Sequence, residues 1–172
     1  MGDVLRTTCL LPALKRLYPA SHITWITKKN AADLLATNVY VDQVLSIESN
    51  YLEILLVQEF DLAIGPDTDF LSASIMTLIK SAVKKGFVAD RRGGVLSLNE
   101  AARRWLHMGM VDGAKRRNRY TYGKWLYDIC ELDYPVERPI FAPTADSRAP
   151  GPFWFSLTCP VGEAMVLFQH RR

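Results

Sequence analysis

The stretch DLAIGPDTDFLSASIMTLIKSAVKKGFVA, residues 61–89, decides the fold. Its first five residues form a short apolar run that a glycine-proline pair ends, which predicts a buried strand. Asp67 or Thr68 can cap a helix that follows this turn. Residues 84–89 return as a second strand. A strand, a helix and another strand in this order predict two parallel strands of one sheet.

The same alternation continues on both sides of this unit. Runs rich in β-branched and aromatic residues predict strands, and apolar residues at every third or fourth position predict helices. We expect further strands at 22–27 and 43–47, and helices at 4–18, from 30, at 52–60, at 99–108 and at 118–130. Pro12 predicts a kink or a late start of the first helix. Together these elements predict an α/β domain, a Rossmann-like parallel sheet with helices on both faces.

Two features of the sequence depart from this regular pattern. Gly2-Asp3 leads into a helix without a preceding strand, so we expect the first strand of the domain to be missing. After about residue 143 the periodicity is lost, and prolines become frequent. We therefore divide the chain into a domain at 1–143 and a linker or orphan tail at 144–172, with at most one strand near 164–168. The expectation is a chain that is incomplete at both ends.

The composition excludes several classes of protein. Hydrophobic residues make up 49% of the 172 residues and charged residues 23%, which is ordinary for a globular domain. The apolar runs fall well short of the ~20 residues that a bilayer span needs. An acid at position 3 stands where a signal peptide would be basic. The default compartment is therefore the cytoplasm.

The sequence contains no motif for a metal ion or a nucleotide cofactor. The three cysteines and three histidines are widely spaced and lack the intervals of a metal site. Asp67 and Asp69 resemble a metal-binding pair, but their place before a helix favours a cap. Neither a dinucleotide-binding glycine motif nor a phosphate-binding loop occurs. We therefore expect no metal and no cofactor.

Charge is distributed unevenly along the chain. Residues 31–79 contain eight acidic residues and no Lys or Arg, whereas residues 84–119 contain ten basic residues. A basic excess of this kind favours an anionic partner, such as phosphate groups or an acidic membrane surface. A solvated surface without a partner explains it equally well, and both interpretations stay open here.

Gly2-Asp3 is the sharpest candidate for chemistry. Ligands of open α/β sheets bind at the carboxyl ends of the strands, where a strand turns into a helix. A glycine there lets the backbone approach a ligand closely, and the helix dipole favours an ionised Asp3. Such a carboxylate can accept a proton from an attacking hydroxyl. The alternative interpretation is that Asp3 only caps the helix.

Several segments of the chain together resemble glycosyltransferase family 9, the heptosyltransferases of lipopolysaccharide core assembly. The opening GDVLRTT at 2–8 and LLPALKRLYP at 10–19 resemble the start of that family, and HITWIT at 22–27 continues the match. Further similar segments are FDLAI at 60–64, KGF at 85–87, LNEAA at 98–102, HMG at 107–109, NRYTY at 118–122 and ICEL at 129–132. The resemblance covers residues 2–142.

The resemblance implies the N-terminal domain of a two-domain GT-B enzyme that transfers heptose with inversion and without a metal. The donor is a nucleotide-activated heptose, and the acceptor is a phosphorylated, lipid-linked sugar at the inner face of the membrane. Asp3 corresponds to the proposed general base, and Gly2, Arg6 and Thr7 to residues around the acceptor. The implied location is cytoplasmic, with peripheral contact with the inner membrane.

The chain departs from the family pattern, and this leaves alternatives. The family has a strand before the Gly-Asp turn and a second domain with a glycine-rich opening, and neither has a counterpart here. We therefore expect an inactive fragment. A non-enzymatic module that binds anionic lipid or polysaccharide, half of a split enzyme, or a flavodoxin-like nucleotide-binding domain are the alternatives. Nucleic-acid binding is not expected, because core packing explains the aromatics at 120–127 better than base stacking.

Overall fold

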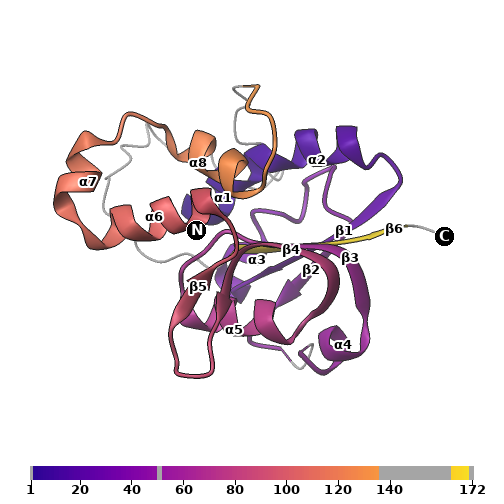
Figure 1. Cartoon of the computed structure of the whole chain (residues 1–172). Coiled ribbons are helices and arrows are strands. Elements are labelled where there is room, and N and C mark those ends of the chain that lie inside the picture. The colour runs from indigo at the N-terminus through magenta and orange to yellow at the C-terminus, as the bar shows by residue number, and fades with distance from the viewer. Residues whose placement is uncertain (1, 50–51, 136–163, 171–172) are drawn as a thin grey trace.

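The structure of the chain is a computed structural model. A six-stranded sheet lies at its centre (Figure 1). The structure describes residues 2–49, 52–135 and 164–170. Within them, the strand order is β2-β1-β6-β3-β4-β5. The strands are β1 (Ser21–Thr27), β2 (Gln43–Ser46), β3 (Glu59–Gly65), β4 (Lys80–Ala89), β5 (Val95–Ser97) and β6 (Ala164–His170).

The predicted α/β class is confirmed, but the prediction of an all-parallel sheet is wrong. Strands β1 and β2 are parallel, as are β3 and β4. Strand β6 lies between these pairs and runs antiparallel to both β1 and β3. The backbone of β6 forms hydrogen bonds with the N–H and C=O groups of β1 and β3 that face it. Without β6, these buried groups would have no hydrogen-bond partners. The strand expected near 164–168 is therefore present, at the centre of the sheet.

Strand β5 is a second antiparallel element that the sequence reading missed. A tight turn returns the chain onto β4, where Val95 pairs with Ala89. The carboxylate of Asp90 accepts hydrogen bonds from the backbone N–H groups of Arg92 and Gly94, at 2.8 and 2.6 Å. Gly93 has a φ of +83°, which an L side chain rarely adopts.

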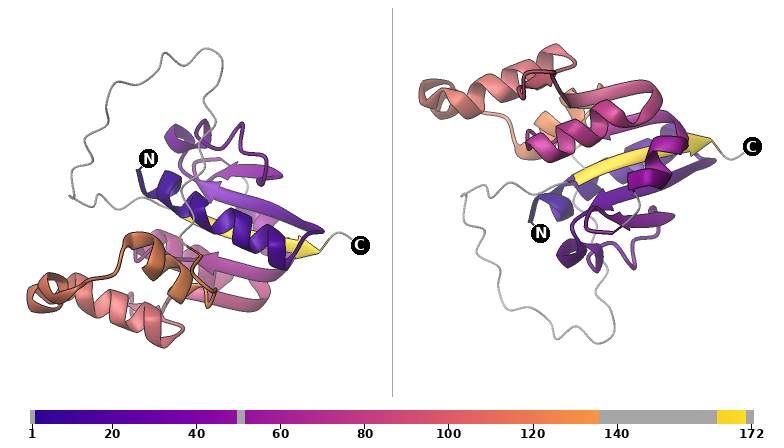
Figure 2. Two further views of the ribbon diagram at one scale, coloured as in Figure 1. Left: turned by 90° about the horizontal axis from the view of Figure 1, so that it is seen from above. Right: turned by 90° about the horizontal axis from the view of Figure 1, so that it is seen from below.

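Helices cover both faces of the sheet, as predicted (Figure 2). The N-terminal helices and α8 pack on one face, and α4 and α5 pack on the other. The helical elements are α1 (Gly2–Thr7), the 3-10 turn η1 (Thr8–Leu10), α2 (Leu11–Leu17), α3 (Lys29–Ala32), α4 (Leu52–Val57), α5 (Phe70–Leu78), α6 (Glu100–Met110), α7 (Asp112–Arg117) and α8 (Tyr122–Ile129).

Alternation along β1 divides the core between the two faces. Ile23 and Trp25 belong to the cluster under α2 and α8, whereas Ile26 belongs to the cluster under α4 and α5. Side chains of successive strand residues point to opposite faces, so one apolar strand supplies both layers. All three side chains are buried, which explains why this segment reads as continuously apolar.

The strand–helix–strand unit at 61–89 forms as predicted, with a different cap. The carboxylate of Asp69, rather than Asp67 or Thr68, accepts the N–H groups of Leu71 and Ser72 at the start of α5. Gly86 has a φ of +102°, and a Cβ there would lie 2.0 Å from the backbone oxygen of the paired Gly65. The central glycine of β4 is thus required by close contact with β3.

Several helix boundaries differ from those predicted. The first helix begins at Gly2 and is interrupted by η1 just before Pro12. Helix α8 is capped by Thr121 and so begins later than the predicted residue 118, and α7 was not predicted. The domain boundary at 143 and residues 144–163 lie outside the described residues. Among the residues described, no helix is long and apolar enough to cross a bilayer.

Candidate functional site

The start of α1 lies at the edge of the sheet where the parallel strands end. Thr27, the last residue of β1, pairs with Ala164 at the beginning of β6, and α1 contacts β6. Figure 2 shows the N-terminus near this end of β6 and the C-terminus beyond the other end. This edge is where open α/β sheets bind their ligands.

Asp3 and Arg6 form an ion pair on the first turns of α1. The Asp3 side chain is largely buried, whereas that of Arg6 is 36% exposed. The Arg6 guanidinium also lies over the ring of Tyr122, 4.4 Å from the ring centre. Asp3 is inside the helix and is therefore not its N-cap. The Asp3 carboxylate is thus oriented by the Arg6 guanidinium, which is itself accessible to solvent.

Tyr122, at the start of α8, lies near enough to Asp3 and to Asp67, in the loop after β3, for both charges to affect the pKa of its hydroxyl. Burial of Tyr122 raises the pKa of its hydroxyl above the usual value, and the negative charges of Asp3 and Asp67 raise it further. Arg6 and a hydrogen bond with Thr7 act in the opposite direction. Asp67 follows the end of β3 by two residues. The site therefore brings together α1, α8 and a strand-to-helix loop.

Thr7 and Gly2 complete the set of residues that the sequence singled out. The buried Thr7 hydroxyl donates to the backbone oxygen of Asp3 at 2.7 Å. Gly2 is exposed, and a Cβ added there would meet no atom within 4 Å. The four predicted residues thus lie on one turn and a half of helix. Their binding of an acceptor stays a prediction.

An aromatic cluster extends from this site toward α6. The ring of Trp105 lies 5.6 Å from that of Tyr122 and 5.8 Å from that of Trp125. Trp125 and Tyr127 are buried, and the Tyr127 hydroxyl donates to the backbone oxygen of Cys9 at 2.8 Å. These aromatics pack between helices, as the sequence indicated. Tyr120 is the more exposed member, 5.4 Å from Trp125.

An open pocket of about 320 Å³ lies against the same aromatic cluster. Its basic lining comes from Arg104 and His107 on α6, and from Arg117 and Arg119 at and after the end of α7. The Arg104 guanidinium lies 5.6 Å from the centre of the Trp125 ring. Cations beside aromatic faces suit a ligand that carries both an anionic group and a ring.

Asn118 organises this pocket, although the sequence predicts it as the first residue of a helix at 118–130. Its side-chain oxygen accepts the Trp125 indole N–H at 3.1 Å and the backbone N–H of Tyr120 at 3.0 Å. Its amide donates to the Tyr120 backbone oxygen. Only the fold identifies Trp125 as the partner of Asn118.

Some basic residues of the stretch at 84–119 stabilise the fold, and others line the pocket. Lys84 donates to the backbone oxygen of Thr77 at 3.0 Å, and its burial lowers its pKa. Lys85 donates to the Cys130 backbone oxygen at 2.8 Å and pairs with Glu131 at 3.3 Å. Both lysines thus hold β4 to its neighbours. The arginines of α6 and α7 are the ones that surround the pocket.

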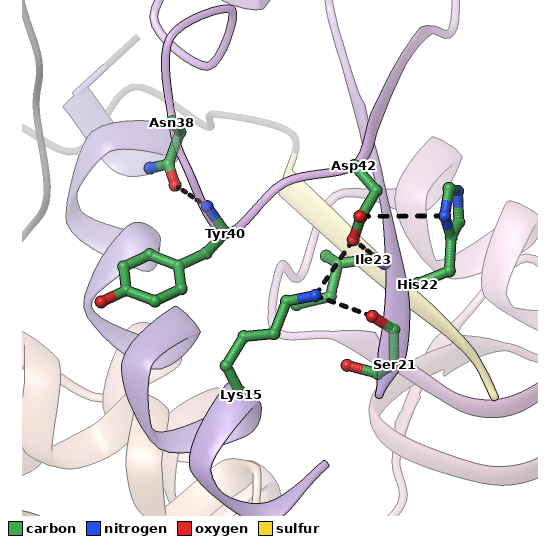
Figure 3. Close-up of polar contacts among 7 residues, drawn as sticks. All are labelled: Lys15, Ser21, His22, Ile23, Asn38, Tyr40 and Asp42. Carbon is green, nitrogen blue, oxygen red and sulfur yellow. Dashed lines mark hydrogen bonds and ion pairs between the residues drawn. The ribbon is translucent and has the colours of Figure 1, made fainter. Parts of the chain in front are cut away.

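A different carboxylate, Asp42, is engaged at the opposite edge of the sheet (Figure 3). It accepts the backbone N–H of Ile23 at 2.9 Å and the Lys15 ammonium at 3.1 Å. Its burial opposes ionisation, but Ile23, Lys15 and His22 outweigh this and hold the pKa of Asp42 below its usual value. Lys15 also donates to the Ser21 backbone oxygen at 2.7 Å. Asp42 therefore anchors α2 and β2 to the start of β1.

In the described part of the chain, no group of three or more His, Cys, Asp or Glu side chains is arranged to hold a metal ion. Cys9 and Cys130 are buried and are not joined in a disulfide, and burial raises the pKa of Cys130. A buried thiol of raised pKa is a poor nucleophile. These cysteines belong to the core.

Comparison with known proteins gives no match. No protein-family model matches the sequence. No curated protein and no solved structure matches it either. The assignment of a function therefore depends on the geometry at the end of the sheet and on the resemblance in the sequence.

Proposed function

We propose that this chain forms the acceptor-binding side of a sugar transferase of the heptosyltransferase type. The observation that carries the proposal is the Asp3–Arg6 pair at the carboxyl edge of the parallel strands. A carboxylate at this edge of an open α/β sheet lies where ligands bind. Three further residues singled out with Asp3, namely Gly2, Arg6 and Thr7, lie on the same helix.

In the proposed reaction, Asp3 accepts the proton of an acceptor hydroxyl. The hydroxyl oxygen bonds to the anomeric carbon of a nucleotide-activated heptose, and the nucleotide leaves from the opposite side with the electrons of the broken bond. One displacement of this kind inverts the anomeric centre. Arg6 orients the Asp3 carboxylate, and Gly2 leaves space for the acceptor. General-base catalysis of this kind contributes typically 10²–10⁴-fold.

The basic pocket supports an acceptor that carries phosphate. Arg104, Arg117 and Arg119 present guanidinium groups next to Trp125 and Tyr120. Guanidinium groups suit phosphate oxygens, and aromatic faces suit sugar rings. The resemblance in the sequence implies that this reaction takes place at the cytoplasmic side of a membrane.

A non-enzymatic module that binds anionic lipid or polysaccharide is the second candidate. The ion pair of Asp3 with Arg6 favours this candidate, because a carboxylate that is bound to a guanidinium is a weaker proton acceptor. In this case the basic pocket carries the function, and Asp3 stabilises the start of α1. Both candidates bind an anionic, lipid-linked ligand, but only the transferase forms a glycosidic bond to it.

A transfer assay separates the two candidates. Nucleotide-activated heptose and a phosphorylated, lipid-linked sugar are incubated with the chain alone, and with the chain plus a separately supplied donor-binding domain of a heptosyltransferase. We expect product with an inverted anomeric configuration, identified by NMR, in at least one of the two mixtures. A folded chain that binds the acceptor but yields product in neither mixture favours the binding module. A folded chain that binds no acceptor contradicts both candidates.

A further inference from the structure

The turn between α6 and α7 exposes two adjacent apolar side chains. Met110 is 71% exposed and Val111 is 40% exposed. The rest of α6 packs normally, because Ala102 is buried and Trp105 and Leu106 lie against the core cluster of Phe87. The exposed pair is therefore confined to the tip of the α6–α7 unit, which stands away from the sheet (Figures 1 and 2).

The α6–α7 segment that carries this apolar tip is rich in cationic residues. Residues 100–119 contain six Lys and Arg side chains and two acidic ones. Arg103 is paired with Glu100 at 2.7 Å. Within residues 2–49, 52–135 and 164–170, no ion pair forms to the other five, which are Arg104, Lys115, Arg116, Arg117 and Arg119. Their charge is available to an external anion.

A second group of exposed apolar side chains, on α4 and α5, differs from the α6–α7 tip in its neighbouring charges. Val57 is 76% exposed, and Phe70, Leu71 and Leu78 are about half exposed. The charged residues that flank Val57, Phe70 and Leu71 in the sequence are the acids Glu53, Glu59 and Asp69, and a cation, Lys80, follows two residues after Leu78. An anionic partner is disfavoured there, whereas the α6–α7 tip combines apolar side chains with unpaired cations.

We propose that the α6–α7 tip docks on an anionic phospholipid bilayer. Met110 and Val111 enter the interfacial region, and Lys115 and Arg116 lie at the level of the headgroup phosphates. Apolar burial and attraction to anionic lipid are the two contributions that hold an interfacial helix. The attraction acts over about one Debye length, ~8–10 Å in physiological salt, so it depends on ionic strength. This inference does not depend on sugar transfer.

Co-sedimentation with lipid vesicles tests the proposal. The chain is mixed with vesicles of phosphatidylcholine alone, or of phosphatidylcholine with phosphatidylglycerol, at low and high salt. We expect binding only to the anionic vesicles, weakened by salt. Lys115→Ala and Arg116→Ala, which do not line the pocket, should each weaken binding about fivefold. Met110→Asp should weaken it at least as much.

Two matched controls separate docking from general charge and hydrophobicity. The double change Arg91→Glu and Arg92→Glu alters charge in the β4–β5 turn, and Val57→Asp adds an acid at an equally exposed apolar position. Both variants should bind vesicles within about twofold of wild type. Equal binding to neutral and anionic vesicles overturns the proposal, as does equal weakening by the controls. Displacement by millimolar inorganic phosphate also overturns it and favours a free-phosphate site.

Discussion

The carboxylates Asp42 and Asp3 lie at opposite edges of the sheet, and they differ in what engages them. At the edge where β1 begins, Asp42 accepts a backbone N–H and an ammonium group that also holds Ser21. At the edge where β1 and β3 end, Asp3 pairs with the partly exposed Arg6. The first carboxylate joins three segments of backbone, whereas the second is held by one side chain that solvent reaches.

This difference suggests a separate role for each of the two carboxylates. Removing Asp42 breaks bonds that define the register of β2 against β1. Removing Asp3 breaks an ion pair between neighbouring turns of one helix, and ion pairs of partly exposed side chains contribute little to stability. We therefore expect Asp42 to govern folding and Asp3 to govern function.

The largest expected effect is that of Asp3→Asn on sugar transfer. The amide keeps the shape of the side chain but cannot accept the proton, so turnover should fall about 10²–10⁴-fold. Its free energy of unfolding should change by less than about 1 kcal/mol. Turnover in the mixture with the donor-binding domain, and urea denaturation, measure the two quantities.

Asp42→Asn is the matched control for that comparison. It makes the same chemical change at the other edge and should leave turnover within a few-fold of wild type, measured at a temperature where both are folded. Equal losses of turnover in the two variants would show that Asp3 acts only through the fold.

Asp42→Asn should lower the free energy of unfolding more than Asp3→Asn does. Asp42→Asn weakens charge-assisted hydrogen bonds and should cost about 1–2 kcal/mol at neutral pH. Because the folded pKa of Asp42 lies below its ordinary value of 3.8, its contribution is present above that value and is lost as the pH falls through the folded pKa. Urea denaturation of both proteins from pH 7 to pH 3 should show the difference shrinking. A difference that is constant with pH would contradict this origin.

The basic pocket extends the comparison to the ligand. Arg104→Ala removes a guanidinium beside Trp125 and should weaken binding of a phosphorylated sugar about tenfold, with little effect on an unphosphorylated one. Isothermal titration calorimetry measures both. Arg91→Ala, in the β4–β5 turn, is the control and should leave both affinities unchanged. Equal weakening for the two sugars would assign Arg104 to packing.

The smallest effect is expected for Tyr122→Phe. The raised pKa of Tyr122 means that its contribution to stability is complete below the ordinary value of 10.0 and is lost as the pH rises through the folded pKa. The variant should therefore lose less stability than wild type above pH 10, and cost at most about 1 kcal/mol at pH 7. Thermal denaturation across this range compares them. An identical alkaline loss in both proteins would exclude Tyr122 as its source.

Local sequence predicted the parts of the fold that local chemistry determines. Ile23, Trp25 and Ile26 mark β1 because an apolar, β-branched and aromatic run suits a strand buried on both faces. The proximity of Asp3, Arg6 and Thr7 follows from helical spacing alone. The β4–β5 turn was missed, although Gly93-Gly94 after Asp90 was a usable signal.

Long-range pairing was the part that the sequence did not reveal. The placement of β6 between β1 and β3 depends on which strands need partners, and residues 164–170 do not encode this. Likewise, nothing near Asn118 in the sequence indicates that it receives the Trp125 indole N–H. The pocket depends on α7, whose six mostly polar residues have no apolar periodicity.

The most direct test of the comparison is NMR mapping of backbone amides while a phosphorylated sugar is titrated into the chain. We expect the shifts to concentrate at the carboxyl edge, in residues 2–7, 66–69 and 118–125, and to be small around Ile23 and Asp42. Shifts that concentrate around Ile23 and Asp42, or saturating ligand without any shift at residues 2–7, would contradict the assignment of function to the Asp3 edge.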